Sequence, residues 1–257
     1  MIARPLTSNC EKLFEENSHI CFGVSPFNSY FTEERLRELA RFGRQMFRSM
    51  HFFVPDVPSA HTLEALGYPR VKAEAKARQQ ANYTRNRITK ALSATGMSLP
   101  EIWRVFVGWK ELSENSRFLE LYDAAQQLFE SDLEFRAECL EASRWVLEKR
   151  LSSEEMTEEK LLCAVKYLLA EIPLFADAAG ILGVESSVFC YHQTIPFLNR
   201  LYGGLLAFPV SRRQGFLVVT TEADMGTTGK DAIGLTSATS PCDPGIETIQ
   251  ESVNLAQ

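Results

Sequence analysis

The stretch HICFGV, residues 19–24, decides the fold class. It is a short apolar run typical of a buried strand, and the chain then breaks at Ser25 and Pro26 into a small polar segment. Further runs of this kind alternate with long amphipathic stretches; they are MHFFV, IWRVFV and GFLVVTT, at residues 50–54, 102–107 and 215–221. Such alternation predicts an α/β domain with a mostly parallel sheet flanked by helices.

The amphipathic stretches predict the helices. Residues 33–47 form one of them and a basic stretch at residues 70–92 forms another. Apolar residues spaced by three and four predict two more helices, over residues 113–150 and 152–171. Ser152 and Glu155 have the spacing of a capping box, which would start the last of these helices.

The composition indicates one domain. The chain has 257 residues, of which 45% are hydrophobic, enough for one substantial core. We expect a catalytic domain at 19–221, an N-terminal extension at 1–18, and a flexible tail at 222–257, where Gly, Ser and Thr replace large apolar residues. Since no secretion signal or long apolar span is evident, we expect a cytoplasmic monomer without membrane contact.

Metals and nucleotide cofactors are not expected. The six cysteines are scattered without a C-x-x-C pair, and the four histidines show no ligand spacing, so we expect reduced thiols and no metal. The segment GTTGKD, residues 226–231, lacks the first glycine of a phosphate loop, and Asp231 replaces its Ser or Thr. There is also no G-x-G-x-x-G fingerprint, so we expect no cofactor.

Ser25 directly follows the first predicted strand, at its carboxyl end. Open α/β sheets bind their ligands at such ends, so Ser25 is a candidate nucleophile. The segment GVSPF half-resembles a nucleophile elbow, but Phe27 stands in place of the second glycine. The alternative is that Ser25 and Asn28 only shape a turn, since Ser before Pro is common in turns.

Tyr167 and Glu171 lie four residues apart, so they share one face of a predicted helix. Pro173 is expected to end or kink this helix just beyond Glu171, which puts a carboxylate in the last turn. A carboxylate is unfavourable there by roughly 0.3–1 kcal/mol unless it binds a cation. Glu171 is thus either a solvated or salt-bridged residue or the acceptor for an ammonium group, with the Tyr167 hydroxyl beside it.

Tyr191 and His192 follow a short β-prone run in VESSVFCYHQ. Both can act as general acids or bases, the histidine because its pKa lies near neutrality. The alternative for His192 is an ordinary buried histidine with no catalytic role.

The predicted helix at residues 70–92 carries a concentrated positive charge. Seven basic residues stand there against one acid, Glu74, although the whole chain has a net charge of −6, and no DNA partner is expected. Pro69 suits the first helical position, and Ala77, Ala81 and Ile88 fall on an arc that can face the core. Such a face favours an RNA backbone as partner, recognised by charge.

Together these segments resemble the tRNA-dependent cyclodipeptide synthases. The family's pattern of His, three residues, a hydrophobic strand end and Gly-x-Ser is matched by His19, Gly23 and Ser25. Its pattern Tyr-x-x-x-Glu-x-Pro is matched by Tyr167 and Glu171, with Pro173 after them. The similarity extends through PLFADAAGILGVESSVFCYH, residues 173–192, and covers about residues 19–221. It departs from the family at Cys21 and Phe22, where aliphatic residues are preferred.

The resemblance implies a Rossmann-like domain similar to the catalytic domain of class I tyrosyl- and tryptophanyl-tRNA synthetases, and the Asn-bearing branch of the family. It implies that Ser25 accepts an aminoacyl group from a first aminoacyl-tRNA, that a second aminoacyl-tRNA extends it to a dipeptidyl group, and that ring closure releases a 2,5-diketopiperazine. Residues expected to take part in the chemistry are Ser25, Tyr167, Glu171, Tyr191 and His192.

The remaining roles implied by the resemblance concern binding. Beside Tyr167 and Glu171, the residues expected to bind the aminoacyl group are Gly23, Asn28, Phe175 and Phe189. The basic cluster expected to bind the tRNA is Arg78, Arg85, Arg87 and Lys90.

Two other functions stay open on the sequence. A serine hydrolase would use Ser25, Asp177 and His192, which occur in the order Ser, Asp, His. A non-catalytic tRNA-binding module would use the basic helix alone. The identity of the two joined amino acids cannot be predicted, because selectivity between apolar side chains rests on about 1–3 kcal/mol.

Overall fold

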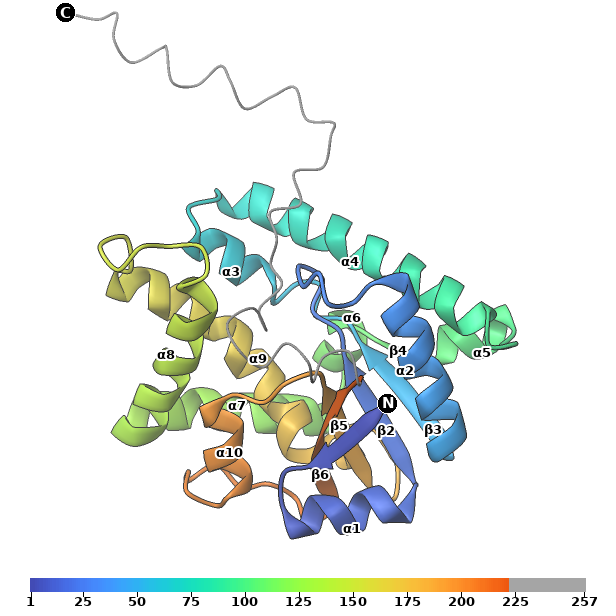
Figure 1. Ribbon diagram of the computed structural model, residues 1–257. Helices are drawn as coiled ribbons and strands as arrows, with labels where there is room; N and C mark the ends of the chain where they lie inside the picture. The colour runs from blue at the N-terminus through green and yellow to red at the C-terminus, as the bar shows by residue number, and fades with distance from the viewer. Residues whose placement is uncertain (222–257) are drawn as a thin grey trace, which may run out of the picture.

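A computed structural model describes residues 1–221, so the predicted tail and the GTTGKD segment lie outside the described residues. The described chain forms one sheet, with the strand order β1-β6-β5-β2-β3-β4 (Figure 1). The strands are β1 (Ile2–Pro5), β2 (His19–Gly23), β3 (Ser49–Phe53), β4 (Phe106–Val107), β5 (Ser187–Tyr191) and β6 (Gln214–Thr220). Neighbouring strands are parallel except for β1, which runs antiparallel to β6. The predicted mostly parallel α/β fold is confirmed.

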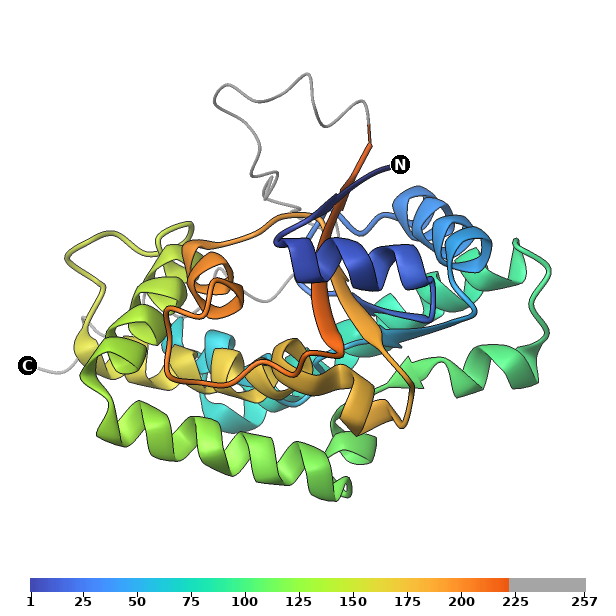
Figure 2. The same cartoon turned by 90° about the horizontal axis from the view of Figure 1, so that it is seen from below.

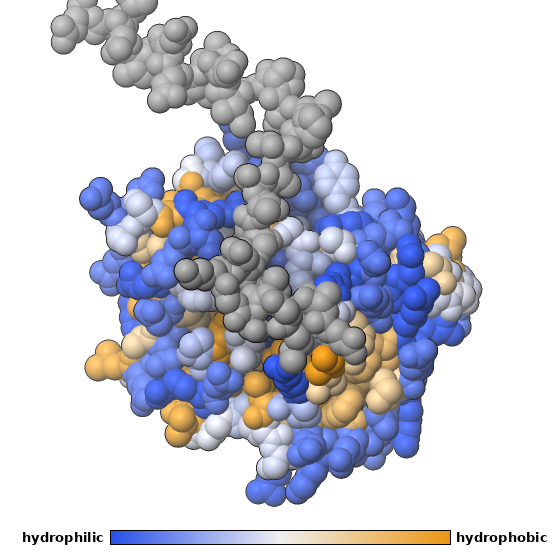
Figure 3. Space-filling view, viewed as in Figure 1, coloured by the Kyte–Doolittle hydropathy of each residue, from blue (hydrophilic) through white to orange (hydrophobic). Residues whose placement is uncertain are grey.

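Helices cover both faces of this sheet. Their bounds are α1 (Ser8–Glu16), α2 (Glu33–Met46), α3 (Ala60–Ala65), α4 (Arg70–Ser93), α5 (Leu99–Arg104), α6 (Trp109–Ser113), α7 (Ser116–Ser131), α8 (Leu133–Leu147), α9 (Glu158–Leu182) and α10 (Pro196–Tyr202). Figure 2 shows α7 running beside α9 under the sheet. The charged outer side of α2 forms a hydrophilic stretch at the right of Figure 3.

The alternation of side chains along β2 divides the core in two. Ile20 and Phe22 point to the face that α2, α4 and α5 cover, whereas Cys21 points to the face that α7, α8, α9 and α10 cover. All five residues of β2 are buried, because the strand is central and both of its faces are packed. This explains why residues 20–24 are continuously apolar instead of alternating.

The strand order reverses at β2, which pairs with β3 on one side and with β5 on the other. In open α/β sheets, the carboxyl ends of the strands at such a reversal form a crevice where ligands bind. Ser25 follows β2, and Tyr191 ends β5, so the topology brings both to this point.

Residues 1–18, set apart above as an N-terminal extension, are built into the sheet. Strand β1 pairs with β6, with Ile2 opposite Thr220, and Cys10 and Leu13 of α1 are buried in the core. Residues 2–16 therefore pack as part of the same folded unit as the rest of the sheet.

Several predicted elements differ from the observed ones. Only the end of the stretch IWRVFV is a strand, the two-residue β4, and its first three residues belong to helix α5, because Ser98 and Glu101 form a capping box that starts a helix before it. The expected helix at 113–150 is two helices, since Asp132 ends α7 and its side chain caps α8 through Phe135 N.

Helix α9 begins later and continues further than predicted. Thr157 caps it, while the Ser152 and Glu155 contacts lie in the preceding turn. The helix passes through Pro173 and shows non-helical dihedrals only at Asp177, so Glu171 does not lie in the last turn. The apolar residues around Pro173 are buried on all sides, and this packing outweighs the one lost hydrogen bond. Among residues 1–221, no helix combines the length and apolar character needed to cross a membrane.

Candidate active site

Ser25 lies at the first residue of a tight turn that follows β2. The strand hydrogen bonding ends with Val24 N donating to Phe53 O at 2.9 Å, and Asn28 N then donates to Ser25 O at 3.2 Å. The Asn28 side chain holds the turn, because its Oδ1 accepts from Tyr30 N at 2.9 Å. Ser25 and Asn28 therefore do shape a turn, as the alternative had it, and Ser25 Oγ and Asn28 Nδ2 still reach the crevice.

Three hydroxyl groups meet at this crevice. Ser25 Oγ lies 3.1 Å from the Tyr191 hydroxyl oxygen and 3.4 Å from that of Tyr167. Asn28 Nδ2 donates to the Tyr191 hydroxyl at 3.1 Å. Because the Tyr191 oxygen accepts this bond, its own proton is directed to Ser25 Oγ or to a ligand bound there.

The two tyrosines keep their protons at neutral pH. Burial is the main reason why the pKa of Tyr191 rises to about 12, although its hydrogen bonds with Ser25 and Asn28 oppose the shift. Burial, followed by the charge of Glu171, also raises the pKa of Tyr167 well above its usual value. Both tyrosines thus stay neutral beside the serine. Tyr191 can donate its proton to Ser25 Oγ, whereas Tyr167 donates to Glu171 and can accept from Ser25 Oγ.

Glu171 lies one turn after Tyr167 on α9, as the spacing predicted. Burial raises the pKa of its carboxyl to about 7, and a hydrogen bond from Tyr167 partly opposes this shift. A carboxyl with this pKa exchanges its proton near neutral pH, and a bound cation would favour its charged form. The group can therefore hold an ammonium and accept a proton from it.

His192 lies at the edge of the same cluster. Its Nε2 is 3.5 Å from Asn28 Nδ2, and its ring stacks on Tyr30 with 4.1 Å between ring centroids. Stacking and this contact fix the orientation of the imidazole next to Tyr191.

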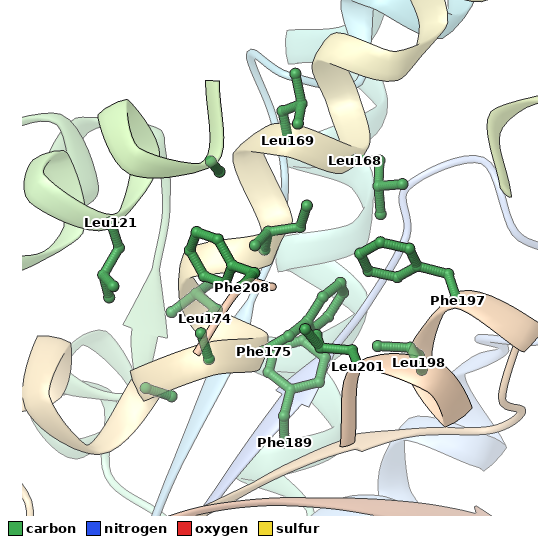
Figure 4. Close-up of a cluster of buried hydrophobic side chains, with 14 of the residues drawn as sticks. Leu121, Leu168, Leu169, Leu174, Phe175, Phe189, Phe197, Leu198, Leu201 and Phe208 are labelled. Carbon is green, nitrogen blue, oxygen red and sulfur yellow. The ribbon is translucent and has the colours of Figure 1, made fainter. Parts of the chain in front are cut away.

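The apolar wall of the crevice is aromatic. Phe175 of α9 meets Phe189 of β5 edge to face, with 4.9 Å between ring centroids, beside Leu198 of α10 (Figure 4). A Cβ atom at Gly23 would come within 2.7 Å of the Phe189 ring. Gly23 thus leaves the space at the end of β2 that the Phe189 ring occupies.

These residues line a cavity of about 210 Å³. Its inner part contains Gly23, Ser25, Asn28, Tyr167, Glu171, Phe175, Phe189 and Tyr191, so the structure brings together all of the candidate residues but His192 and the basic cluster. Its outer part is formed by residues of α3 and α8 and the segment after α8, among them Leu63, Leu66, Trp145, Lys149 and Arg150. Sequence reasoning missed this outer part, because no local pattern connects α3 and α8 with the crevice.

Asp177 does not form a catalytic triad with Ser25 and His192. One of its carboxylate oxygens binds Arg117 Nε at 2.9 Å, and the other accepts from Gly180 N at 3.0 Å. Asp177 therefore stabilises the kink in α9. It is not available as the third residue of a Ser-His-Asp triad, so the structure does not favour a serine hydrolase.

The basic helix forms as predicted, with Ala77, Ala81 and Ile88 buried. Its four candidate tRNA-binding residues differ in their surroundings. Arg85 forms a salt bridge with Asp56 at 2.9 Å, and Arg87 donates to Phe31 O at 2.8 Å, so both help to hold the loops around the crevice.

Arg78 and Lys90, by contrast, lie on the exposed side of α4. The Arg78 side chain is 57% exposed and lies 3.7 Å from Glu74, and Lys90 is exposed. These two are therefore the members of the cluster that a large external partner can reach.

Comparison with known proteins gives a consistent answer. The family model described as "Cyclodipeptide synthase" matches residues 1–221. The chain is 33% identical over 229 residues to cyclo(L-leucyl-L-leucyl) synthase of Bacillus subtilis, which covers 87% of this chain and 91% of the relative. It is also 33% identical over 225 residues to cyclo(L-tyrosyl-L-tyrosyl) synthase of Mycobacterium tuberculosis, covering 86% and 76%.

Solved structures agree with these relatives. A cyclodipeptide synthase from Bacillus thermoamylovorans superposes with a TM-score of 0.78 at 31% identity, covering 86% of this chain and 96% of that one. A Mycobacterium tuberculosis protein, whose structure relates cyclodipeptide synthetases to type I tRNA synthetases, gives 0.75 at 33% identity, covering 86% and 93%. The fold, the family model and these similarities show that the chain is an enzyme of the cyclodipeptide synthase family.

Proposed function

We propose that this enzyme joins two aminoacyl groups, each delivered as an aminoacyl-tRNA, through a covalent intermediate on Ser25. The observation that carries the proposal is the position of Ser25 Oγ. It lies at the carboxyl end of β2 within hydrogen-bonding distance of two protonated tyrosines, in a cavity that also contains Glu171. A nucleophile, proton donors and an ammonium acceptor thus surround one space.

In the first step, Ser25 Oγ attacks the ester carbonyl carbon of an aminoacyl-tRNA. The new Oγ–C ester bond forms, the bond between that carbon and the terminal ribose oxygen breaks, and the tRNA leaves with the serine proton. One ester replaces another, so no ATP is needed. The Tyr191 hydroxyl, directed to this point by Asn28, donates to the oxygen that becomes negative.

Glu171 and Tyr167 hold the α-ammonium of the aminoacyl-enzyme. The raised pKa of Glu171, about 7, suits it to take a proton from this ammonium, because only the neutral amine is nucleophilic. The amine then attacks a second aminoacyl-tRNA, an amide bond forms, and the second tRNA leaves.

Ring closure completes the cycle. The new terminal amine attacks the ester carbonyl on Ser25, the Oγ–C bond breaks, and a 2,5-diketopiperazine leaves with Ser25 regenerated. As the Oγ–C bond breaks, Tyr191 donates its proton to Ser25 Oγ and takes up the proton that the attacking amine loses, while His192 positions Asn28 and Tyr30 around it. The combination of Asn28, Tyr191 and His192 supports membership of the Asn-bearing branch.

The lining of the cavity supports an apolar first aminoacyl group. Phe175, Phe189 and Leu198 form its inner wall, and a polar side chain there would lose its hydrogen bonds to water. The basic face of α4 supports tRNA binding, with Arg78 and Lys90 as the contacting residues.

The intermediate can be tested by intact-protein mass spectrometry. The protein is mixed with tRNA charged with one amino acid at a time and is quenched in acid. We expect a mass increase of one aminoacyl residue for the wild type and the Ser29→Ala control, and none for Ser25→Ala. A mass increase that persists in Ser25→Ala would overturn the role of Ser25.

A further inference from the structure

A second cluster of reactive side chains lies between α3 and α9, apart from Ser25. His61 and Glu64 are three residues apart on α3, and Cys163 faces them from α9. One imidazole nitrogen, one carboxylate oxygen and the Cys163 sulfur all lie within 4.8 Å of one another. Two ligands of a tetrahedral zinc ion are roughly 3.3–3.8 Å apart, as bond lengths of 2.0–2.3 Å require. The three groups are thus close to the spacing of a metal site.

Glu64 stands between the other two groups. Its Oε1 is 3.8 Å from His61 Nδ1, and its Oε2 is 3.9 Å from Cys163 Sγ. The His61 contact is too long for a good hydrogen bond. His61 Nδ1 is shielded from solvent and has no hydrogen-bond partner among residues 1–221. A buried nitrogen without a partner is costly, and a metal ion would use its lone pair.

The surrounding charges leave this cluster able to bind a cation. Lys166 and Arg70 are the basic groups that act on His61, and Glu74 is a further acid nearby. Arg70 Nε lies 3.1 Å from the Glu74 carboxylate, so these two charges largely cancel. Glu64 and a Cys163 thiolate would together supply two negative charges against the one of Lys166.

We propose that His61, Glu64 and Cys163 bind one Zn²⁺ ion, with water as the fourth ligand. Nitrogen, oxygen and sulfur donors in a set of three with one open position suit zinc, whereas Mg²⁺ and Ca²⁺ prefer oxygen alone. On binding, the Cys163 thiol releases its proton to solvent as the sulfur–zinc bond forms, and no electron is transferred.

The ion would cross-link α3 and α9, two helices whose residues line the cavity. Thr62 and Leu63 of α3, and Leu66 just after it, line this cavity. Cys163 lies one helical turn before Tyr167, which lines it from α9. Zinc would therefore fix the distance between the outer wall and the helix that carries Tyr167 and Glu171. This inference does not depend on the reaction proposed above.

The site can be tested by metal binding to the purified full chain, reduced and freed of metal by chelation. Equilibrium dialysis measures Zn²⁺ uptake, and absorbance with Co²⁺ in place of zinc reports a thiolate–cobalt bond. We expect one ion per wild-type chain, and at least about tenfold weaker binding for Cys163→Ser and His61→Ala. The control is Cys242→Ser, a cysteine outside the described residues, which should bind as the wild type does.

Two outcomes would overturn the site. One is a wild-type chain that takes up no stoichiometric ion. The other is a thiolate–cobalt absorbance that is unchanged in Cys163→Ser. Melting curves recorded with a chelator check that the variants fold. Added Zn²⁺ should then raise the melting temperature of the wild type and of Cys242→Ser more than that of Cys163→Ser or His61→Ala. If Cys163→Ser does not fold, Glu64→Gln takes its place, and equal zinc affinity in that variant contradicts the proposal.

Discussion

The two ends of β2 carry polar side chains in opposite situations. At the amino end, His19 is buried, with Nδ1 2.8 Å from Ser187 Oγ and Nε2 2.8 Å from His51 Nδ1. At the carboxyl end, Ser25 and Tyr191 face a cavity of about 210 Å³. Both ring nitrogens of His19 are used by protein groups, whereas the hydroxyls at the other end bond mainly to one another and can turn to a ligand.

The difference shows how one strand serves both stability and chemistry. Burial, followed by the charge of His51, lowers the pKa of His19 to about 3, so it stays neutral at any ordinary pH. Burial raises the pKa of Glu171 to about 7, so this group changes charge near neutrality. Desolvation shifts the pKa of both His19 and Glu171, but only Glu171 lies beside the cavity, where it can exchange its proton with a bound ligand.

The sharpest test substitutes one serine at each end. Ser25→Ala should reduce cyclic dipeptide formation by at least about a thousandfold, because the nucleophile is lost, while thermal stability stays close to that of the wild type. Ser187→Ala should retain activity but lose about 1–3 kcal/mol of unfolding free energy, because His19 Nδ1 is left without its partner.

Mass spectrometry of the product and denaturant unfolding are the two measurements. The comparison fails if Ser187→Ala loses activity while its stability is unchanged, since the amino end would then take part in the reaction.

Glu171→Gln should give the next largest effect. We expect an activity loss of about a hundredfold, because the amide cannot accept the ammonium proton. The unfolded chain loses the Glu171 proton near pH 4.5 and the folded chain near pH 7, so the wild type loses stability as the pH rises between these values.

The variant should therefore be more stable than the wild type at pH 8, by up to roughly 3 kcal/mol at about 1.4 kcal/mol per pKa unit, and equally stable at pH 4. Denaturant unfolding at the two pH values measures this. An equal difference at both would contradict the raised pKa.

At the amino end of β2, His19 predicts that stability changes with pH in the opposite direction. The unfolded chain protonates His19 near pH 6.5 and the folded chain only near pH 3, so the wild type should lose about 2 kcal/mol of unfolding free energy between pH 7 and pH 5. The slope of stability against pH should be smaller in His19→Asn. A slope equal to that of the wild type would assign the pH dependence to other groups.

The smallest effect is expected on the outer surface. Arg78→Glu with Lys90→Glu should reduce kcat/KM for aminoacyl-tRNA by about tenfold at low salt and less at high salt, because phosphate contacts are screened. The matched control is Lys12→Glu with Arg213→Glu, which makes the same change in net charge near α1 and β6. Equal losses in the two pairs would exclude a specific role for α4.

Arg85 and Arg87 are unsuitable for this test. Asp56, the partner of Arg85, also accepts from Trp109 N, and Arg87 binds Phe31 O. Reversal of either charge would disturb these loops, so a loss of activity in such a variant would not report on tRNA binding alone.

The inner site could be predicted because its residues follow simple geometry. Ser25 and Tyr191 come at the carboxyl ends of strands that pair, and Tyr167 and Glu171 are one helical turn apart. Such relations are local in the sequence, once the parallel sheet is assumed. The family resemblance then related them to one reaction.

The outer cavity and the proposed zinc site had no such local signal. Leu63 and Trp145 reach the crevice only through the packing of α3 and α8, and Cys163 meets Glu64 from 99 positions away. The prediction that Pro173 ends or kinks the helix was wrong for a related reason. The residues around Pro173 are buried by contacts that the sequence does not reveal, and this packing stabilises the helix despite the proline.

The pairing of β1 with β6 has a consequence for how the chain folds during synthesis. Ile2 lies opposite Thr220, so the strand made first finds its partner only when the last described strand has left the ribosome. Until then, β5 also lacks β6, and the edge of the growing sheet stays open beside the residues that will form the active site. The pairing of β1 with β6 joins distant parts of the chain. Such contacts form slowly, because the loop between them loses entropy when it closes. The candidate site, which Phe216 of β6 helps to line, is therefore completed late, in the same event that adds β6 and β1 to the sheet.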